Sequence, residues 1–215
     1  NFGLGALLHV VAKPPAERRQ VVAALGPLWL WHEVWLVAAG GVLFAAFPLV
    51  MAVSFSGYYL ALFLVLWSLL LRGIAIEMGG TLENPLWRSF WHATLSVSSI
   101  ALALLFGVAM GNLLRGVPLD ASGAFQMAFF TNFGVRGHVG LLDWYTVSLG
   151  VCALLVLSAH GATYLTLKTD GPVHDRSARA ARILWPAAAA SVAIVCAQAW
   201  FVRPELYTAL PSRPV

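Results

Sequence analysis

The sequence predicts an all-α membrane protein, a polytopic bundle of about five full transmembrane helices preceded by a partial one. Of its 215 residues, 60% are hydrophobic and only 10% are charged, and the mean hydropathy is +0.81. Soluble domains carry about 25% charged residues. The hydrophobic residues form long continuous runs, whereas membrane β-barrels show alternating segments of about ten residues, so helices are favoured. These observations exclude a soluble globular enzyme, a disordered chain and a nucleic-acid-binding protein.

The apolar runs define the expected elements in chain order. Residues 1–12 are apolar but too short to cross a bilayer, which takes about 20 residues, so we interpret them as the tail of a span whose beginning is missing. Pro48 lies inside the first complete run and predicts a kink. The chain is expected to be one transmembrane domain over residues 1–215, truncated at both ends. The five full spans are predicted at residues 25–53, 57–71 (extending through Ile76), 90–113, 141–167 and 183–202.

The basic residues are distributed unequally between the two sets of alternate loops. Membrane proteins concentrate Lys and Arg in their cytoplasmic loops. The larger set, which we therefore place in the cytoplasm, contains Lys13, Arg18, Arg19, Arg72, Arg88, Lys168, Arg176, Arg179 and Arg182. The smaller set contains Arg115, Arg136, Arg203 and Arg213. This orientation puts the polar loop at residues 114–140 outside the cell.

Glu33 is the sharpest candidate for function, because it lies within the first full span. Ionisable residues inside a membrane are costly and often mark proton or substrate pathways. Burial favours the neutral carboxyl unless a cation pairs with it. Two hypotheses follow: Glu33 conducts protons, or it forms a structural pair with a cation on a neighbouring helix such as Arg72.

His32, next to Glu33, allows three interpretations: a proton relay, a haem ligand or a hydrogen-bonded core histidine. The same three apply to His9, His92 and His160. Haem ligation requires a partner group and a flat cavity, which one sequence does not reveal. We take His32, together with Glu33, as a candidate for a proton conduit.

The remaining polar and aromatic candidates indicate structure or partner contacts. Trp29 belongs to a group of tryptophans near the expected cytoplasmic span ends, which is typical of an aromatic belt. Arg72 and Glu77 are five residues apart, not the four of an ideal helical pair, so we expect each to contact other helices or another subunit. The sequence has no Walker loop, no GxGxxG, no HExxH and no nucleophile elbow, so we expect no catalytic residue and no metal site in this chain. Cys152 and Cys196 are expected to be small buried hydrophobic residues.

Several motifs, in order along almost the whole chain, carry a resemblance to a known family. They are GGVLFAAFP at 40–48, FSGYYLAL at 55–62, LRGIAIE at 71–77, GNLLRGVPLD at 111–120, GLLDWYTV at 140–147, HGA at 160–162 and KT at 168–169. Together they resemble subunit II of cytochrome bd-type quinol oxidases. The motif at 71–77 contains Arg72 and Glu77. The motifs at 111–120 and 140–147 contain two further candidates for structural or partner contacts, Asp120 and Asp143.

The resemblance implies a fold, an activity and partners. It implies a fragment of an eight-helix fold in two four-helix halves, paired with a homologous subunit I in a bacterial or archaeal plasma membrane. The complex would oxidise quinol and reduce dioxygen to water. The resemblance implies no cofactor in this chain beyond a possible bound quinone, and haems b and d in subunit I. Subunit II would support assembly and carry protons, in contact with lipid and with any small accessory subunits.

The sequence departs from the family at the start of the first full span. The family usually has Gly-Pro-Val-Trp-Asp-Gly-Asn-Glu-Val-Trp, and the Asp is linked to proton delivery. Here Leu30 stands in place of that Asp, with Trp31 and His32 in place of the Gly and Asn, and Asn1 replaces another family acid. Leu30 does not exchange protons, so His32 or Glu33 would have to substitute.

Two further hypotheses stay open. The loss of the acid at Leu30 favours a structural or interaction subunit of another membrane complex, derived from the oxidase but not serving oxygen reduction. A secondary transporter would use broken helices at the midplane. Pro48 weakly favours a transporter, whereas the family motifs oppose it.

Overall fold

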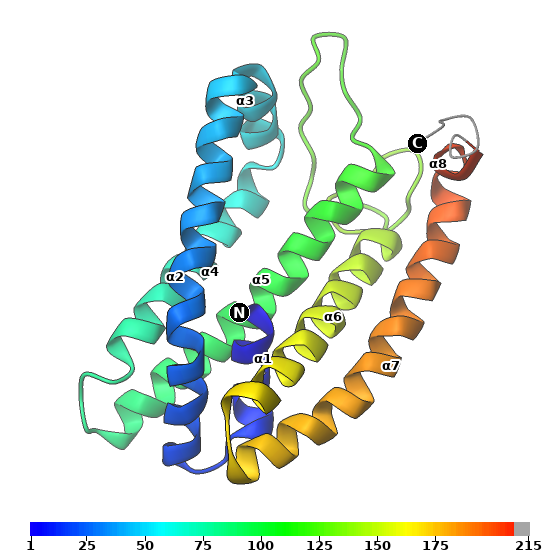
Figure 1. Cartoon of the computed structure of the whole chain (residues 1–215). Helices are drawn as coiled ribbons and strands as arrows, with labels where there is room; N and C mark the ends of the chain where they lie inside the picture. Colours follow the sequence, from blue (N-terminus) through cyan, green and yellow to red (C-terminus); the bar gives the residue numbers. More distant parts are fainter. Residues whose placement is uncertain (209–215) are drawn as a thin grey trace.

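The computed structural model describes residues 1–208, and that part of the chain is a bundle of helices without a β-strand (Figure 1). Five helices are long and apolar enough to cross a membrane, namely α2, α4, α5, α6 and α7, which confirms the predicted all-α membrane fold. The helices are α1 (Phe2–Val11), α2 (Pro15–Ala46), α3 (Pro48–Gly57), α4 (Tyr59–Met78), α5 (Pro85–Arg115), α6 (Trp144–Lys168), α7 (Gly171–Val202) and α8 (Glu205–Thr208).

The helix boundaries differ from the predicted spans for two physical reasons. Helices α2 and α7 begin at Pro15 and Gly171, well before the apolar runs, because charged residues near their starts are helical and lie beyond the hydrophobic segment. With 32 residues each, they are about 48 Å long, which exceeds the roughly 30 Å hydrocarbon core. The kink expected at Pro48 is a complete break, because proline has no N–H for the helical ladder and Phe47 leaves the helical conformation.

Small residues let α1 pack closely against α5 and α6, between which it lies (Figure 1). A Cβ atom on Gly3 would lie 1.8 Å from the carbonyl oxygen of Leu157, and one on Gly161 would lie 2.6 Å from the backbone of Gly3. Nearer the start of α6, a Cβ on Gly107 of α5 would lie 2.7 Å from the Cα of Gly150. Close backbone contact through small residues is a common way for helices to associate in lipid. The α1–α5–α6 contact therefore forms the compact part of the bundle.

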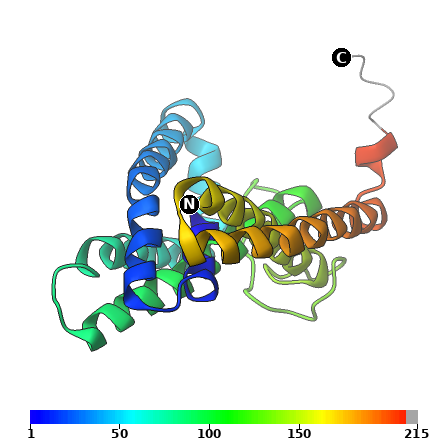
Figure 2. The ribbon, with the colours of Figure 1, turned by 60° about the horizontal axis from the view of Figure 1, so that its bottom comes forward.

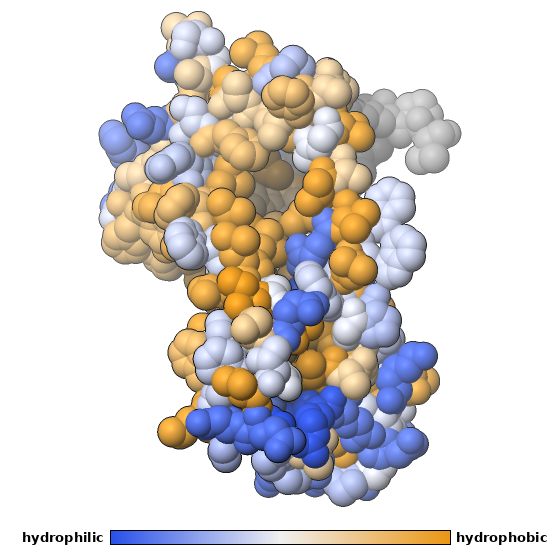
Figure 3. All heavy atoms as spheres, turned by 90° about the vertical axis from the view of Figure 1, so that its left-hand side faces the viewer, coloured by the Kyte–Doolittle hydropathy of each residue, from blue (hydrophilic) through white to orange (hydrophobic). Residues whose placement is uncertain are grey.

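The outer helices are much more exposed than this centre. Large apolar side chains cover the free faces of α2, α3, α4 and α7. The view onto the α2–α4 side shows hydrophobic residues over most of its height and hydrophilic residues gathered at the lower end (Figure 3). Cys196 is exposed on α7, which corrects the expectation that both cysteines are buried; Cys152 is buried. These apolar faces suit contact with lipid or with another protein.

Successive loops alternate between the two ends of the bundle, as the orientation argument requires. The starts of α2, α5 and α7 lie at the lower end of Figure 1, and the long loop between α5 and α6 lies at the upper end. Arg72 does not belong to a loop, because it lies inside α4 and its side chain is fully buried. This corrects its assignment to the cytoplasmic set of basic residues. Arg213, counted at the other end, lies outside the described residues.

Candidate functional site

A group of polar side chains lies where the residue before α1 meets α2, α4 and α5; in it Arg72 is buried, Asn1 and Glu33 are partly buried, and His32 is exposed. We call Asn1, His32, Glu33 and Arg72 the mid-span cluster. Glu33 on α2 and Ser99, which contacts the cluster from α5, are each about 20 Å along their helix from the nearer end. The cluster therefore occupies the part of the bundle where charged groups are most costly.

Arg72 is the centre of the mid-span cluster. Its side chain is fully buried, and its Nη1 donates to Glu33 Oε1 at 3.2 Å. Its Nη2 donates to the side-chain oxygen of Asn1, and its Nε donates to Ser99 Oγ at 3.3 Å. The guanidinium also lies 5.0 Å from the ring centroid of Phe2, a cation–π distance. Each of the three guanidinium nitrogens thus has a partner, which is how a membrane protein can hold a buried cation.

Glu33 is held less completely than Arg72. Its side chain is 24% exposed, and Arg72 is its ion-pair partner within residues 1–208. A carboxylate accepts hydrogen bonds on two oxygens, and the contact with Arg72 uses only Oε1. The other oxygen is therefore open to a proton, a water molecule or a group on another chain. This geometry suits a carboxyl that exchanges protons as well as one that only holds Arg72.

His32 makes two contacts through the same ring nitrogen. Its Nδ1 lies 2.7 Å from the carbonyl oxygen of Leu28 and 3.0 Å from the Nδ2 of Asn1. A protonated Nδ1 donates to the Leu28 carbonyl, whereas an unprotonated Nδ1 accepts from Asn1. The two contacts therefore belong to different tautomers or charge states, and His32 can change partner when it gains or loses a proton.

The residues before His32 show what replaces the family's acid. Leu30 is 57% exposed on the outer face of α2, and Trp31 beside it is 68% exposed. Trp29 is half-buried and packs beside Gly73 of α4, where a Cβ would lie 3.9 Å from its ring. This part of α2 thus presents hydrophobic side chains where the family pattern has an acid, and the titratable groups begin at His32.

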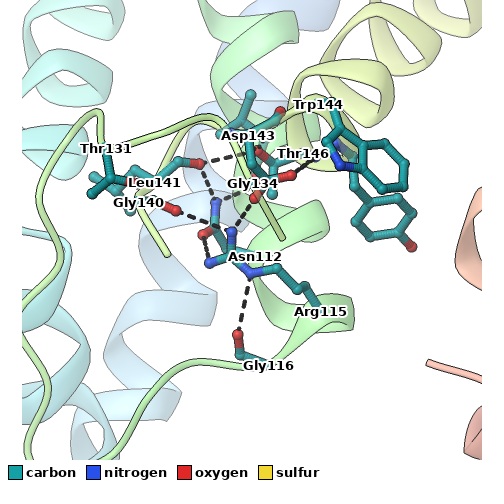
Figure 4. Close-up of polar contacts among 12 residues, drawn as sticks. Asn112, Arg115, Gly116, Thr131, Gly134, Gly140, Leu141, Asp143, Trp144 and Thr146 are labelled. Carbon is teal, nitrogen blue, oxygen red and sulfur yellow. Dashed lines mark hydrogen bonds and ion pairs between the residues drawn. The ribbon is translucent and has the colours of Figure 1, made fainter. Parts of the chain in front are cut away.

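A second polar group joins the two ends of the long loop between α5 and α6 (Figure 4). We call Asn112, Arg115, Asp143 and Thr146 the loop lock. Arg115 forms a buried salt bridge with Asp143, and it also donates to the Gly140 carbonyl at 3.0 Å and to Asn112 Oδ1 at 2.8 Å. Asn112 Nδ2 in turn donates to the Leu141 carbonyl at 2.9 Å. Side chains from the end of α5 thereby fix the segment that leads into α6.

Asp143 also begins helix α6. It caps the first turn by accepting from the N–H groups of Tyr145 and Thr146 at 2.8 and 2.9 Å, while Thr146 Oγ1 accepts from the N–H of Asp143 at 3.0 Å. This reciprocal arrangement is a capping box. All four members of the loop lock are buried and hydrogen-bonded, so the group is structural.

The sequence could identify part of the loop lock but not all of it. An aspartate directly before a helical apolar run is a typical N-cap residue. The partner Arg115, in contrast, is 28 residues away, at the other end of the long loop. Its role depends on how the loop folds back, and no local pattern predicts that.

The two other acidic candidates lie at the surface, away from both groups. Glu77 is exposed near the end of α4 and has no salt bridge within residues 1–208. Asp120 lies in the long loop, where its Oδ1 accepts from Ser122 Oγ at 2.6 Å and from the N–H groups of Ser122 and Ala124 at 2.8 and 3.0 Å. The Ser122 hydroxyl, followed by these backbone donors, lowers the pKa of Asp120. Asp120 therefore shapes a local turn.

The histidines are dispersed over the bundle. His160 is exposed on α6 against Trp185, and His92 is buried near the lower end of α5. Among residues 1–208, no three His, Cys, Asp or Glu side chains converge in a way that could hold a metal ion.

Comparison with known proteins gives consistent results along the whole chain. A family model described as cytochrome bd terminal oxidase subunit II matches residues 1–212. A Haemophilus influenzae protein named probable cytochrome oxidase subunit 2 is 39% identical over 207 residues, which are 96% of this chain and 53% of that protein.

Two further relatives carry more specific names. Cytochrome bd-I ubiquinol oxidase subunit 2 of Escherichia coli K12 is 35% identical over 196 residues, or 91% of this chain and 49% of the relative. Cytochrome bd ubiquinol oxidase subunit 2 of Bacillus subtilis is 31% identical over 183 residues, which are 85% of this chain and 51% of that relative. The chain thus spans about half the length of the relatives it matches.

Proposed function

The chain belongs to the family of cytochrome bd terminal oxidase subunit II, and from this membership we propose that it serves in a quinol:oxygen oxidoreductase as the subunit without haem. In this role it packs against a haem-bearing subunit I, which supplies haems b and d. Its five apolar helices and its bacterial relatives point to a multi-pass protein of the bacterial inner membrane. The family match over nearly all of the sequence is the observation that carries this proposal.

The mid-span cluster supports a second part of the proposal, that this subunit passes protons toward the partner. Within residues 1–208, Glu33 has a partner on only one carboxyl oxygen and is partly exposed, while the adjacent His32 has two alternative partners for Nδ1. Arg72 holds Glu33 and Asn1 in place but passes no proton, because a guanidinium stays protonated in proteins. The proton would therefore move between the neighbouring side chains of His32 and Glu33.

Glu33→Gln in the assembled complex tests the conduit. The amide keeps a hydrogen bond to Arg72 but does not exchange protons, so oxygen consumption per haem and proton uptake should fall, on the order of tenfold or more. Glu77→Gln is the matched control, because it removes an exposed carboxyl at the end of α4 and should leave both rates unchanged. Unchanged oxygen consumption and proton uptake in Glu33→Gln would leave Glu33 as a structural partner of Arg72.

An apolar groove supports a bound quinone. About 490 Å³ in volume, it lies between α2, α3, α4 and α5, and its lining includes Leu36, Leu43, Phe55, Leu62, Phe63 and Phe106. These side chains fit an isoprenoid tail, and Tyr59 adds a hydroxyl to the lining. A quinone there would serve as a structural ligand, held by the hydrophobic walls. Any small accessory subunits would bind the exposed apolar faces of the outer helices.

One observation favours a second function, that of a structural or interaction subunit in another membrane complex. Leu30 stands at the position of the family's proton-delivering acid and is exposed on α2. Purification of the protein with its native partner, followed by an absorbance spectrum, separates the two functions. A partner with b- and d-type haem bands and oxygen consumption supports the oxidase. Co-purification with a different complex, without oxygen consumption, supports the alternative.

A further inference from the structure

A second cavity opens at the lower end of the bundle, away from the mid-span cluster. It has a volume of about 270 Å³ and lies between the first turns of α2, the last turns of α4 and the first turns of α5. With the lower end turned forward, the start of α2 and the α4–α5 turn come into view together (Figure 2). The same end carries the band of hydrophilic residues in Figure 3.

The polar side chains that line this cavity are all basic or neutral donors. Arg19 comes from α2, Arg88 from α5, and His92 lies one helical turn further along α5 from Arg88; no Asp or Glu belongs to the lining. Within residues 1–208 neither arginine has a salt bridge, and Arg88 uses only its Nε, for the Leu82 carbonyl at 3.1 Å. The Nη groups of Arg88 and the whole guanidinium of Arg19 therefore remain for an anion. His92 offers a ring N–H in either neutral tautomer.

The rest of the lining is apolar or lacks side chains. Val22 and Ala23 of α2 face Ala75 and Ile76 of α4 across the cavity, and Gly79 and Gly80 contribute only backbone. A Cβ on Gly80 would meet no atom within 4 Å, so the turn leaves room beside it. The cavity thus combines two cations with a hydrophobic wall, where the exposed apolar faces of α2 and α4 begin.

We propose that this cavity binds an acidic phospholipid, with its phosphate between Arg19 and Arg88 and the start of an acyl chain against the Val22–Ile76 wall. Basic pockets between transmembrane helices at the cytoplasmic surface are suited to anionic headgroups. Arginine forms strong, directional hydrogen bonds to phosphate oxygens. Free inorganic phosphate would satisfy the arginines but would leave the hydrophobic wall unused, which is why a lipid fits better.

Arg176, at the same end of the molecule, shows that not every arginine there is free. It pairs with Glu17 and donates to the Val11 carbonyl at 2.7 Å, so it is already satisfied. Arg179 and Arg182 on α7, in contrast, are exposed and outside the cavity. They provide a control with the same change in charge at the same end of the protein.

The test is to purify the protein, with its native partners, in mild detergent and to measure retained phospholipids by mass spectrometry after extensive washing. The unchanged protein should retain phosphatidylglycerol or cardiolipin in preference to phosphatidylcholine supplied in the same micelles. The double variant Arg19→Gln/Arg88→Gln should lose this lipid several-fold, while Arg179→Gln/Arg182→Gln should keep it. Equal retention in all three proteins, or an equal loss in both double variants, would overturn the proposal.

A third variant separates a lipid from free phosphate. Ala23→Phe fills the hydrophobic side of the cavity and keeps both arginines, so it should reduce lipid retention while inorganic phosphate binding, followed by ³¹P NMR, persists. If Ala23→Phe retains as much lipid as the unchanged protein, and excess inorganic phosphate saturates the site in both, the cavity is a phosphate site and the lipid assignment is wrong.

Discussion

Two of the arginine–carboxylate pairs of this protein, Arg115–Asp143 and Arg72–Glu33, differ in how completely the carboxylate is enclosed. Asp143 is fully buried, pairs with Arg115 and caps helix α6 with its other oxygen. Glu33 is about one-quarter exposed, and among the described residues it uses only one oxygen, for Arg72. An ion pair in which both carboxylate oxygens accept hydrogen bonds can only hold structure, whereas one with an open oxygen can also exchange a proton. The structural role of Asp143 and the proposed proton exchange of Glu33 therefore differ because of burial and hydrogen bonding, not because of the type of residue.

The largest expected effect follows from breaking the loop lock. Asp143→Ala leaves the buried guanidinium of Arg115 without its counter-charge and removes the cap of α6, which should lower the free energy of unfolding by about 3–5 kcal/mol. Thermal unfolding in detergent, followed by circular dichroism, measures this loss. Asp170→Ala is the control, since Asp170 precedes α7 but makes no capping hydrogen bond with its side chain. Asp170→Ala should change stability by less than about 0.5 kcal/mol. Similar losses in the two variants would contradict the assigned role of Asp143.

The next test compares the two pairs directly through double-mutant cycles. Arg115→Gln with Asp143→Asn should show a coupling energy of about 2–3 kcal/mol, and Arg72→Gln with Glu33→Gln about 1 kcal/mol. The smaller value is expected because Glu33 is accessible to water or to a group on another chain. Such a contact would weaken the attraction between Glu33 and Arg72. Unfolding of the four single and two double variants supplies the energies. An equal or larger coupling for the Arg72–Glu33 pair would show that Glu33 is as tightly held as Asp143.

The smallest expected effect is a pH dependence of the loop around Asp120. Because its folded-state pKa is lowered, chiefly by the Ser122 hydroxyl, ionised Asp120 stabilises the turn above the usual carboxyl pKa of about 3.9. That stabilisation is lost as the pH falls through the lowered value. Hydrogen exchange of the Ser122 and Ala124 amides should therefore show protection that decreases in this acidic range, after correction for intrinsic exchange rates. Asp120→Asn should show no such decrease, and a pH-dependent loss of protection in that variant would assign it to another group.

The sequence predicts the architecture well because lipid imposes a simple requirement on it. Long continuous apolar runs have few structures open to them in a membrane, and each of the five predicted spans is largely helical, although the first is divided at Phe47 between α2 and α3. The boundaries are harder to predict, since hydropathy detects only the part of a helix that lies in lipid. The start of α2 at Pro15 and that of α7 at Gly171 fall in charged segments, which extend the helices into the interface.

In the candidate site, too, some features could be predicted from the sequence and others could not. Glu33 and Arg72 stand out in the sequence because charges are rare in apolar runs, and the structure brings them together. The contact of His32 Nδ1 with the Leu28 carbonyl is local to α2, whereas its contact with Asn1 depends on how α2 packs beside the start of α1, which periodicity does not supply. Asn112 and Arg115 resemble ordinary residues at a helix end, and their role appears only when the loop is folded.

The loop lock also constrains the order in which the chain assembles in the membrane. Arg115 and Asp143 are 28 residues apart, and they meet only at the end of the bundle where the loop lies. While the loop and α6 are still being inserted, Asp143 has not reached Arg115, and each charge remains solvated on its own. The pair therefore closes after the loop has crossed and α6 is in place. Its formation opposes the withdrawal of α6 and makes the insertion of the α5–α6 hairpin difficult to reverse.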